Sequence, residues 1–218
     1  MSLVLYGSEM WNSPYVLSCF VALREKRLPF QMRIIALHRG AQHEPAYVGT
    51  SLTSRVPALV DGALSLSESS AIVEYLDDRF PAPEHPLALP ADLAQRARAR
   101  QVMAWVRSDV GALRDERSSE HVFFPPSAAP PLAPLSAAGQ RAAAKVVRVA
   151  SALVPEGGGP LFGSWCVADT DLAMMLWRLS KTGYALPETL RAFAEAEWQR
   201  EAVREFVAME RPGFVAYS

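Results

Sequence analysis

The sequence predicts an α/β first half followed by an all-helical second half. Up to residue 80, strand-like and helical segments follow one another in the order β-α-β and then β-β-α. A proline-rich stretch, residues 81–86, then interrupts the chain, and strand signals nearly vanish beyond it. We therefore expect a first domain at residues 1–80, a linker at 81–90 and an all-helical domain at 91–218.

Each element of the first half has its own signal. The apolar residues 3–6 predict a buried strand, and residues 14–26 repeat apolar side chains at helical spacing after a proline at the first helical position. Residues 30–37 alternate as a second strand. Residues 56–60 and 64–66 predict a hairpin turned at Asp61-Gly62, and residues 71–80 predict a helix.

The second half repeats apolar residues at helical spacing in four groups. These are Val102, Val106, Val110 and Leu113 in the first, Val146, Val149 and Leu153 in the second, Leu172, Leu176 and Leu179 in the third, and Val203, Phe206 and Val207 in the fourth. The segment 121–139 is rich in proline, alanine and serine, and proline is excluded from helix interiors. We expect a loop or an irregular bridge there.

Composition excludes several classes of function. The chain has 218 residues, half of them hydrophobic, and 22 basic and 23 acidic residues are mixed along it, which argues against nucleic acid or a membrane surface as partner. Cys19 and Cys166 lie far apart and outside any metal-binding spacing, so we expect no metal site and a reducing compartment. The first strand is too short for a signal peptide, and a cytoplasmic location is expected.

Two short motifs in the first half point to a ligand site. A cis peptide is tolerated at Val56-Pro57, where it would leave the backbone of Val56 facing outward at a strand end. A helix start at Glu68-Ser69 offers backbone N–H groups and a hydroxyl, which favour a bound carboxylate. Each motif alone is an ordinary structural device. Their pairing predicts a short, peptide-like, anionic ligand.

Ser13-Pro14 is a third motif, and helix capping alone explains it. However, the loop after the first strand and the loop before Val56 should lie at the same end of the sheet. Ser13 then faces a ligand held by Val56, Glu68 and Ser69, and its hydroxyl can donate to a bound thiolate.

These motifs together resemble the cytosolic glutathione transferase family over nearly the whole chain. The resemblance is carried by Ser13, Arg55-Val56-Pro57 and Glu68-Ser69 in the first half and by residues 162–169 in the second. More narrowly, residues 13–18, 68–72, 96–100 and 165–171 are similar to the bacterial YfcF-type transferases.

The resemblance implies a thioredoxin-like first domain that binds glutathione and a helical domain that forms most of the electrophile pocket. It implies that Ser13 is the catalytic hydrogen-bond donor to sulfur. It also implies that Val56 pairs with the cysteinyl backbone, that Glu68 binds the γ-glutamyl amine and that Ser69 binds the γ-glutamyl carboxylate. Gln42 and Arg55 would bind the glycine end. His38, Arg39 or His43 would replace Gln42 if the loop followed a different path.

The function implied is a dimeric glutathione transferase whose thiolate attacks an electrophile or a peroxide, with glutathione as cosubstrate and no cofactor. One alternative is a glutathione-dependent isomerase, although the Ser-Ser-Cys helix start associated with that chemistry is missing at residues 12–14. A second alternative is a non-catalytic protein that binds glutathione or apolar ligands.

Other residues are open to two interpretations. The apolar side chains that could wall the electrophile pocket are Met10, Trp11, Tyr15 and Trp105. For Trp105 a place in the core is equally expected. The resemblance makes Asp109 a candidate to reach the partner subunit's glutathione. Cys166 stands where the family usually has Ser or Thr at the start of its central helix, so we expect a weakened capping box with Asp169. We expect both cysteines to be buried and unreactive.

Overall fold

The computed structural model describes residues 3–213, which divide into two compact units. The first comprises residues 3–88 and 205–213, and the second is Leu89–Arg204. The sequence division placed 205–213 with the helical half, whereas Phe206 packs its ring against Phe20 and Trp11 of the first unit. That aromatic contact explains why the C-terminal segment groups with the sheet.

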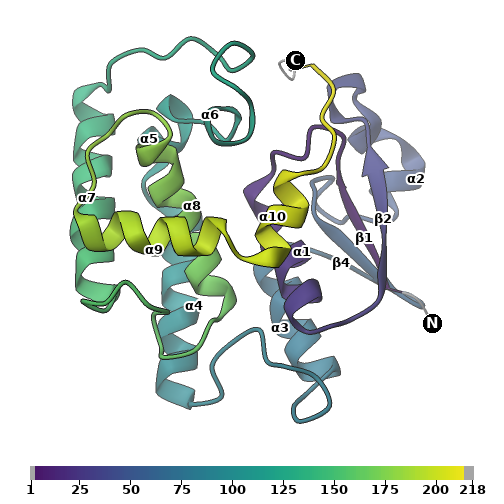
Figure 1. Cartoon of the computed structure of the whole chain (residues 1–218). Coiled ribbons are helices and arrows are strands. Elements are labelled where there is room, and N and C mark those ends of the chain that lie inside the picture. The colour runs from purple at the N-terminus through teal and green to yellow at the C-terminus, as the bar shows by residue number, and fades with distance from the viewer. Residues whose placement is uncertain (1–2, 214–218) are drawn as a thin grey trace. The chain divides into compact units, whose positions relative to one another are not determined.

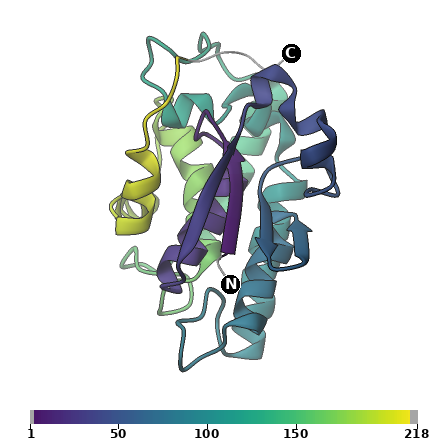
Figure 2. The ribbon, with the colours of Figure 1, turned by 90° about the vertical axis from the view of Figure 1, so that its right-hand side faces the viewer.

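A four-stranded mixed sheet forms the centre of the first unit, in the order β2-β1-β3-β4. Its strands are β1 (Leu3–Ser8), β2 (Phe30–Ile35), β3 (Ala58–Asp61) and β4 (Leu64–Ser67). The strands β1 and β2 run side by side in the same direction, as Figure 2 shows, and the other two pairs are antiparallel. The predicted hairpin of β3 and β4 is present, but its two turn residues are Gly62 and Ala63 rather than Asp61-Gly62, because Asp61 still pairs with Leu64. Gly62 has a φ of 60°.

Two helices, α1 (Pro14–Glu25) and α3 (Ser69–Arg79), pack against this sheet (Figure 1). The stretch of α1 from Val16 to Leu23 is entirely buried, because the helix lies between the sheet and its helical neighbours. The β2–β3 connection contains two 3₁₀ turns, η1 (Leu37–Arg39) and η2 (Ala41–His43), and the short helix α2 (Pro45–Val48). The last helix, α10 (Glu201–Val207), lies beside α1.

Lys26, which follows α1, makes a buried ion pair in the first unit. Its Nζ donates to Asp77 Oδ1 and to the carbonyl oxygens of Phe80 and Pro86, each at 2.9 Å. Asp77 Oδ1 also accepts the N–H of Ala88 at 2.8 Å. Burying a charge is tolerated only with such pairing. Because the partners come from α3 and from the proline-rich stretch 81–86, the network also holds that stretch to the ends of α1 and α3.

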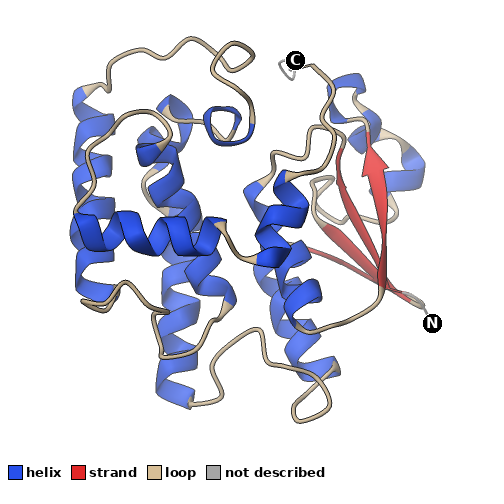
Figure 3. Cartoon of the chain, in the orientation of Figure 1, coloured by secondary structure: helices blue, strands red, loops and turns tan. Residues whose placement is uncertain are grey.

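The second unit is helical throughout its regular structure, as Figure 3 shows. Its helices are α4 (Leu93–Ser108), α5 (Gly111–Glu116), α6 (Glu120–Phe123), α7 (Ala137–Leu153), α8 (Val167–Ser180) and α9 (Glu188–Trp198). Helix α8 is buried from Val167 to Leu179 and forms the centre of the unit. No helix within residues 3–213 is long and apolar enough to cross a membrane.

The structure corrects the helical pattern predicted for residues 102–113. One helix was expected, but Val110 has a φ of 49° and separates α4 from α5. Asp109 accepts the Val110 N–H at 2.7 Å, and Arg114 donates to the carbonyl oxygens of Val106 at 2.9 Å and Asp109 at 2.5 Å. Side-chain bonds thus replace the helical hydrogen bonds at this break.

Candidate functional site

The register of the sheet brings three predicted site segments to one edge. Tyr6 of β1 is opposite Ala58 of β3, and Ala58 is opposite Ser67 of β4. The loop that leads to Ser13, the Val56-Pro57 step and the Glu68-Ser69 helix start therefore leave the sheet at the same end. Because β2 is parallel to β1, with Ser8 opposite Ile35, the loop that carries Gln42 begins at this end as well.

Ser13 is the N-cap of α1, and Pro14 is the first helical residue. Its Oγ accepts the N–H of Val16 at 3.3 Å. A serine hydroxyl has two acceptor lone pairs and one donor hydrogen, so capping leaves the donor function available. Capping and donation to a ligand are thus compatible roles for this half-buried side chain.

The peptide bond between Val56 and Pro57 is cis, as the sequence predicted. The backbone just before it is held by two buried residues of the β2–β3 connection, Tyr47 and Ser51. The hydroxyls of Tyr47 and Ser51 both donate to the Arg55 carbonyl oxygen, at 2.7 and 2.8 Å, and Ser51 Oγ accepts the Arg55 N–H at 3.2 Å. Burial raises the pKa of Tyr47 to about 12, so its hydroxyl remains a donor.

Sequence reasoning did not identify Tyr47 and Ser51. Their role depends on how the connection folds back on Arg55, and no motif announces that contact. The side chain of Arg55 itself is exposed at the edge.

Glu68 and Ser69 form the start of α3. Glu68 has a φ of 72° and a ψ of 115°, an unusual conformation for a residue with a side chain. Its side chain makes no capping bond to the helix. Its side chain is exposed, whereas Ser69 is buried. Such a backbone conformation costs about 1–3 kcal/mol and tends to occur at functional sites.

Glu9 connects the Ser13 loop to the loop after β2. Its carboxylate accepts the N–H groups of Leu37 at 3.0 Å and His38 at 3.2 Å, and it also pairs with Nδ1 of the His38 ring. Burial opposes ionisation of Glu9, but these hydrogen bonds outweigh it and lower the pKa of the carboxyl group. Further along this loop, Gln42 has a buried Oε1 with no hydrogen-bond partner.

Both cysteines are buried. Cys19 lies on α1, and its Sγ is 3.7 Å from the carbonyl oxygen of Ser69. The pKa of Cys166 is raised by burial and by the nearby Asp169 carboxylate, which opposes thiolate formation. No group of three or more His, Cys, Asp or Glu side chains in the described part of the chain could hold a metal ion.

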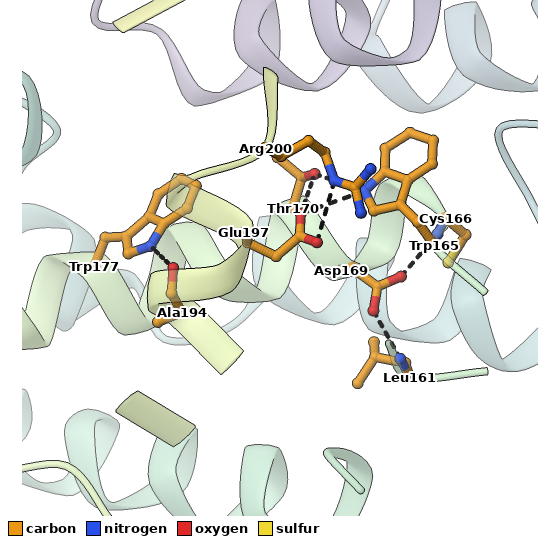
Figure 4. Close-up of polar contacts among 9 residues, drawn as sticks. All are labelled: Leu161, Trp165, Cys166, Asp169, Thr170, Trp177, Ala194, Glu197 and Arg200. Atoms are coloured by element: carbon orange, nitrogen blue, oxygen red, sulfur yellow. Dashed lines mark hydrogen bonds and ion pairs between the residues drawn. The ribbon is translucent and has the colours of Figure 1, made fainter. Parts of the chain in front are cut away.

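Cys166, the residue expected to weaken the capping box, is the N-cap of the central helix α8. Asp169 compensates with both carboxylate oxygens: Oδ2 accepts the Cys166 N–H at 2.8 Å, and Oδ1 accepts the Leu161 N–H at 2.7 Å (Figure 4). Burial raises the pKa of Asp169. This carboxylate therefore holds the preceding loop to the helix as well as capping it.

A second buried carboxylate, that of Glu197 in α9, bonds to residues at the start of α8 and just before it. Its Oε2 accepts from Thr170 Oγ1 at 3.0 Å and from Trp165 Nε1 at 3.3 Å (Figure 4). Arg200 donates to Oε1 at 3.3 Å and stacks over the Trp165 ring at 5.0 Å. Burial raises the pKa of Glu197, and the contacts give it a role in packing the helical unit.

Trp105 is half-buried, so neither a core role nor a wall role describes it alone. Its Nε1 donates to Asp109 Oδ2 at 3.0 Å, and its ring lines a cavity of about 290 Å³ with Val102 and Val149. Asp109 also pairs with Lys145, which lowers the pKa of Asp109 to about 2. The carboxylate proposed to reach a partner is thus engaged within its own unit.

Comparisons with known proteins agree on one family. The model of the glutathione S-transferase N-terminal domain matches residues 5–84, and that of the glutathione S-transferase C-terminal domain matches residues 92–211. A solved glutathione transferase homolog from Burkholderia gl BGR1, with bound glutathione, is similar at a TM-score of 0.76 with 36% identity, over 95% of this chain and 96% of that one.

Two curated relatives are similar over shorter segments. A probable maleylacetoacetate isomerase of Vibrio cholerae serotype O1 is 32% identical over 56% of this chain and 55% of its own length. The glutathione S-transferase theta-3 of Mus musculus is 31% identical over 53% of this chain and 47% of its own. The chain thus spans about half the length of these curated relatives.

Proposed function

The chain belongs to the glutathione S-transferase family, and from this premise we propose that it binds glutathione at the sheet edge described above and activates its thiol. The observation that carries the proposal is the register Tyr6–Ala58–Ser67, which sets Ser13, Val56 and Glu68 around one edge. The thiolate then attacks a small electrophile or a peroxide.

The proposed clamp holds the backbone and the γ-glutamyl end of the tripeptide. Val56 offers its backbone N–H and C=O to the cysteinyl residue, in the manner of an added strand. Glu68 binds the γ-glutamyl amine with its exposed carboxylate. Ser69 binds the γ-glutamyl carboxylate, supported by the positive end of the eleven-residue helix α3.

The glycine carboxylate falls to Gln42 and Arg55 in this proposal. The side chain of Arg55 is exposed, and a guanidinium suits a carboxylate. With Oε1 of Gln42 buried, its Nε2 is the group that remains to donate. His38 fits the role less well, since its ring pairs with Glu9 and accepts from Arg39 at 3.1 Å, while Arg39 and His43 remain alternatives.

Thiol activation follows from hydrogen bonding to sulfur. A free thiol has a pKa of about 8.5, and lowering it by about two units, worth about 2.7 kcal/mol, makes the thiolate dominant at neutral pH. The Ser13 O–H donates to the sulfur, and the N-terminus of α1 adds its dipole. The thiol proton leaves to solvent, and Ser13 keeps its own proton, so no base partner is needed for it.

The two proposed reactions differ in the atom attacked. With an electrophilic carbon, the sulfur forms a C–S bond as the leaving group departs. With an organic peroxide, the sulfur attacks oxygen and the O–O bond breaks to release the alcohol. A second glutathione then reduces the resulting sulfenic acid, which yields glutathione disulfide and water.

Isomerase activity is a second candidate because a relative with 32% identity is named a probable maleylacetoacetate isomerase. An isomerase would use the same thiolate and return glutathione unchanged. Against it stands the sequence Asn12-Ser13-Pro14, which lacks the expected Ser-Ser-Cys start.

Three finer assignments rest on the sequence and on the family. We propose YfcF-type membership from the motifs at residues 13–18 and 165–171, a homodimer from the family, and a cytoplasmic location from the two well-separated cysteines. A non-catalytic binding protein remains the rival from a different class of function.

The test compares wild type with Ser13→Ala for glutathione affinity and for turnover of an aryl halide, an organic peroxide and maleylacetoacetate. The proposal predicts tight binding by both proteins and turnover that is lost in the variant. Binding without turnover in wild type would favour the non-catalytic alternative, and turnover of maleylacetoacetate alone would favour the isomerase. Failure of wild type to bind glutathione would overturn the proposal.

A further inference from the structure

The C-terminal segment, residues 205–213, bonds to the backbone that leads into Ser13. The guanidinium of Arg211 donates from Nη2 to the carbonyl oxygen of Trp11 at 3.0 Å. The same side chain donates to the last carbonyls of α10 and the turn after it, at 3.2 Å to Phe206, 2.6 Å to Val207 and 2.8 Å to Met209. A planar fork with five donors can bridge these directions at once.

Trp11 is held in a conformation that bulky residues rarely adopt. Its φ is 46°, in the left-handed region, and such a backbone persists only where surrounding contacts over-determine it. One contact is aromatic: the Trp11 ring packs edge-on against Phe206 at 5.4 Å and against Phe20 at 6.4 Å. Phe206 itself is fully buried.

The other end of the same loop is fixed from β1. Ser8 accepts the Met10 N–H with its Oγ and the Trp11 N–H with its carbonyl oxygen, both at 3.1 Å. The backbone of Trp11 is thereby held at its N–H by Ser8 and at its carbonyl oxygen by Arg211. Its carbonyl group begins the short stretch through Asn12 to Ser13, so its orientation sets where the Ser13 hydroxyl lies.

We propose that Arg211 is a positioning residue for thiol activation, with the C-terminal segment holding Trp11 in its left-handed conformation and thereby aiming Ser13. The inference rests on the proposed function and deepens it. Hydrogen-bond strength falls steeply with misalignment, so a small rotation of the 11–13 backbone weakens donation to sulfur. In the proposed site the tripeptide is bound by Val56, Glu68 and Ser69, whereas Arg211 bonds to the carbonyl oxygens of Trp11, Phe206, Val207 and Met209.

The experiment measures the thiol pKa of bound glutathione by titrating thiolate absorbance, together with glutathione affinity. Arg211→Met removes the donors, and Phe206→Leu removes the ring against Trp11 while keeping the guanidinium. Arg204→Met is the matched control, because Arg204 is an exposed arginine on α10, the helix that carries Phe206 and precedes Arg211. Thermal melting and circular dichroism establish that each variant is folded.

For Arg211→Met the inference predicts a thiol pKa higher by about one unit, which is a tenfold smaller ratio of thiolate to thiol at a given pH, with unchanged glutathione affinity. Phe206→Leu shifts the thiol pKa in the same direction by less, and Arg204→Met does not shift it. These readouts differ from those of a merely structural role, which would lower the melting temperature and leave the thiol pKa unchanged.

An unchanged thiol pKa in folded Arg211→Met and Phe206→Leu would overturn the inference while the proposed function stood. An equal shift in Arg204→Met would also overturn it, since loss of charge would then suffice. If wild type itself bound glutathione without lowering the thiol pKa, the proposed activation would fail, and the inference with it.

Discussion

The hydroxyl of Tyr47 donates to the carbonyl oxygen of Arg55 at 2.7 Å and so fixes the backbone one residue before Val56. Ser51 donates to the same oxygen at 2.8 Å. The proposed peptide-binding edge is thus supported by two buried hydroxyls, neither of which would touch the tripeptide.

Tyr47→Phe is predicted to weaken glutathione binding without slowing the chemical step. The change removes one hydrogen bond and leaves the ring packing against Tyr6 at 5.7 Å, so the expected loss is about 0.5–1.5 kcal/mol, or up to roughly tenfold in KM for glutathione. Tyr6→Phe is the matched control, since the Tyr6 hydroxyl accepts from Arg33 instead. An unchanged KM in Tyr47→Phe would show that Ser51 alone holds Arg55.

Lys26→Met is predicted to destabilise the first unit severely. It leaves the buried Asp77 carboxylate without its ammonium partner, and breaking a buried pair in this way costs about 3–5 kcal/mol. Urea unfolding of the intact chain measures the loss, and the double variant Lys26→Met with Asp77→Leu should recover part of it. A double variant no more stable than the single one would contradict this account.

Cys166→Ser is predicted to stabilise the protein by up to about 1 kcal/mol, because a serine hydroxyl caps a helix better than a thiol does. Asp169 already bonds the Cys166 N–H, so the gain comes from the other half of the capping box. Thermal unfolding of Cys166→Ser and Cys166→Ala separates capping from the loss of sulfur. Equal stability of the two variants would exclude a capping effect.

Glu197 is predicted to make stability depend on pH. Burial raises its pKa in the folded state, so the folded chain holds this proton more tightly than the unfolded chain. Its stabilising contribution is therefore full below an unfolded pKa of about 4.3 and is lost as pH rises through the folded value. Asp169 reinforces the rise in pKa, and Arg200 opposes it.

Glu197→Gln should flatten this dependence when the free energy of unfolding is measured by urea between pH 4 and 7. The exposed Glu195→Gln on the same helix serves as the control and should keep the wild-type slope. The same slope in wild type and Glu197→Gln would show that Glu197 ionises normally in the folded protein.

Local signals predicted the elements that position the site, because those elements depend on neighbouring residues. Ser13-Pro14 marked the start of α1, Asp61-Gly62 marked the hairpin, and Val56-Pro57 marked the cis bond. The helix α9 was not predicted. Leu190, Phe193 and Glu197 are buried at helical spacing, but a glutamate at the third of these positions interrupts the apolar pattern. The bridge expected at 121–139 is irregular only over residues 124–136, because α6 extends to Phe123 and α7 begins at Ala137.

Contacts distant in sequence were the part that residue patterns did not reveal. Tyr47 reaches Arg55 only through the fold of its connection, and Arg211 meets Trp11 across almost the whole chain. The left-handed Trp11 and Val110 also carry no signal in residue type, since neither is glycine or asparagine. Such positions are set by tertiary packing, so a single sequence leaves them open.

The central claim, that Ser13 activates glutathione, is tested most directly by the thiol pKa of glutathione bound to wild type and to Ser13→Ala. We predict a pKa about two units below the free value of about 8.5 in wild type, and a return toward the free value in the variant with binding retained. An identical, lowered pKa in both proteins would contradict the account and leave Ser13 as a helix cap alone.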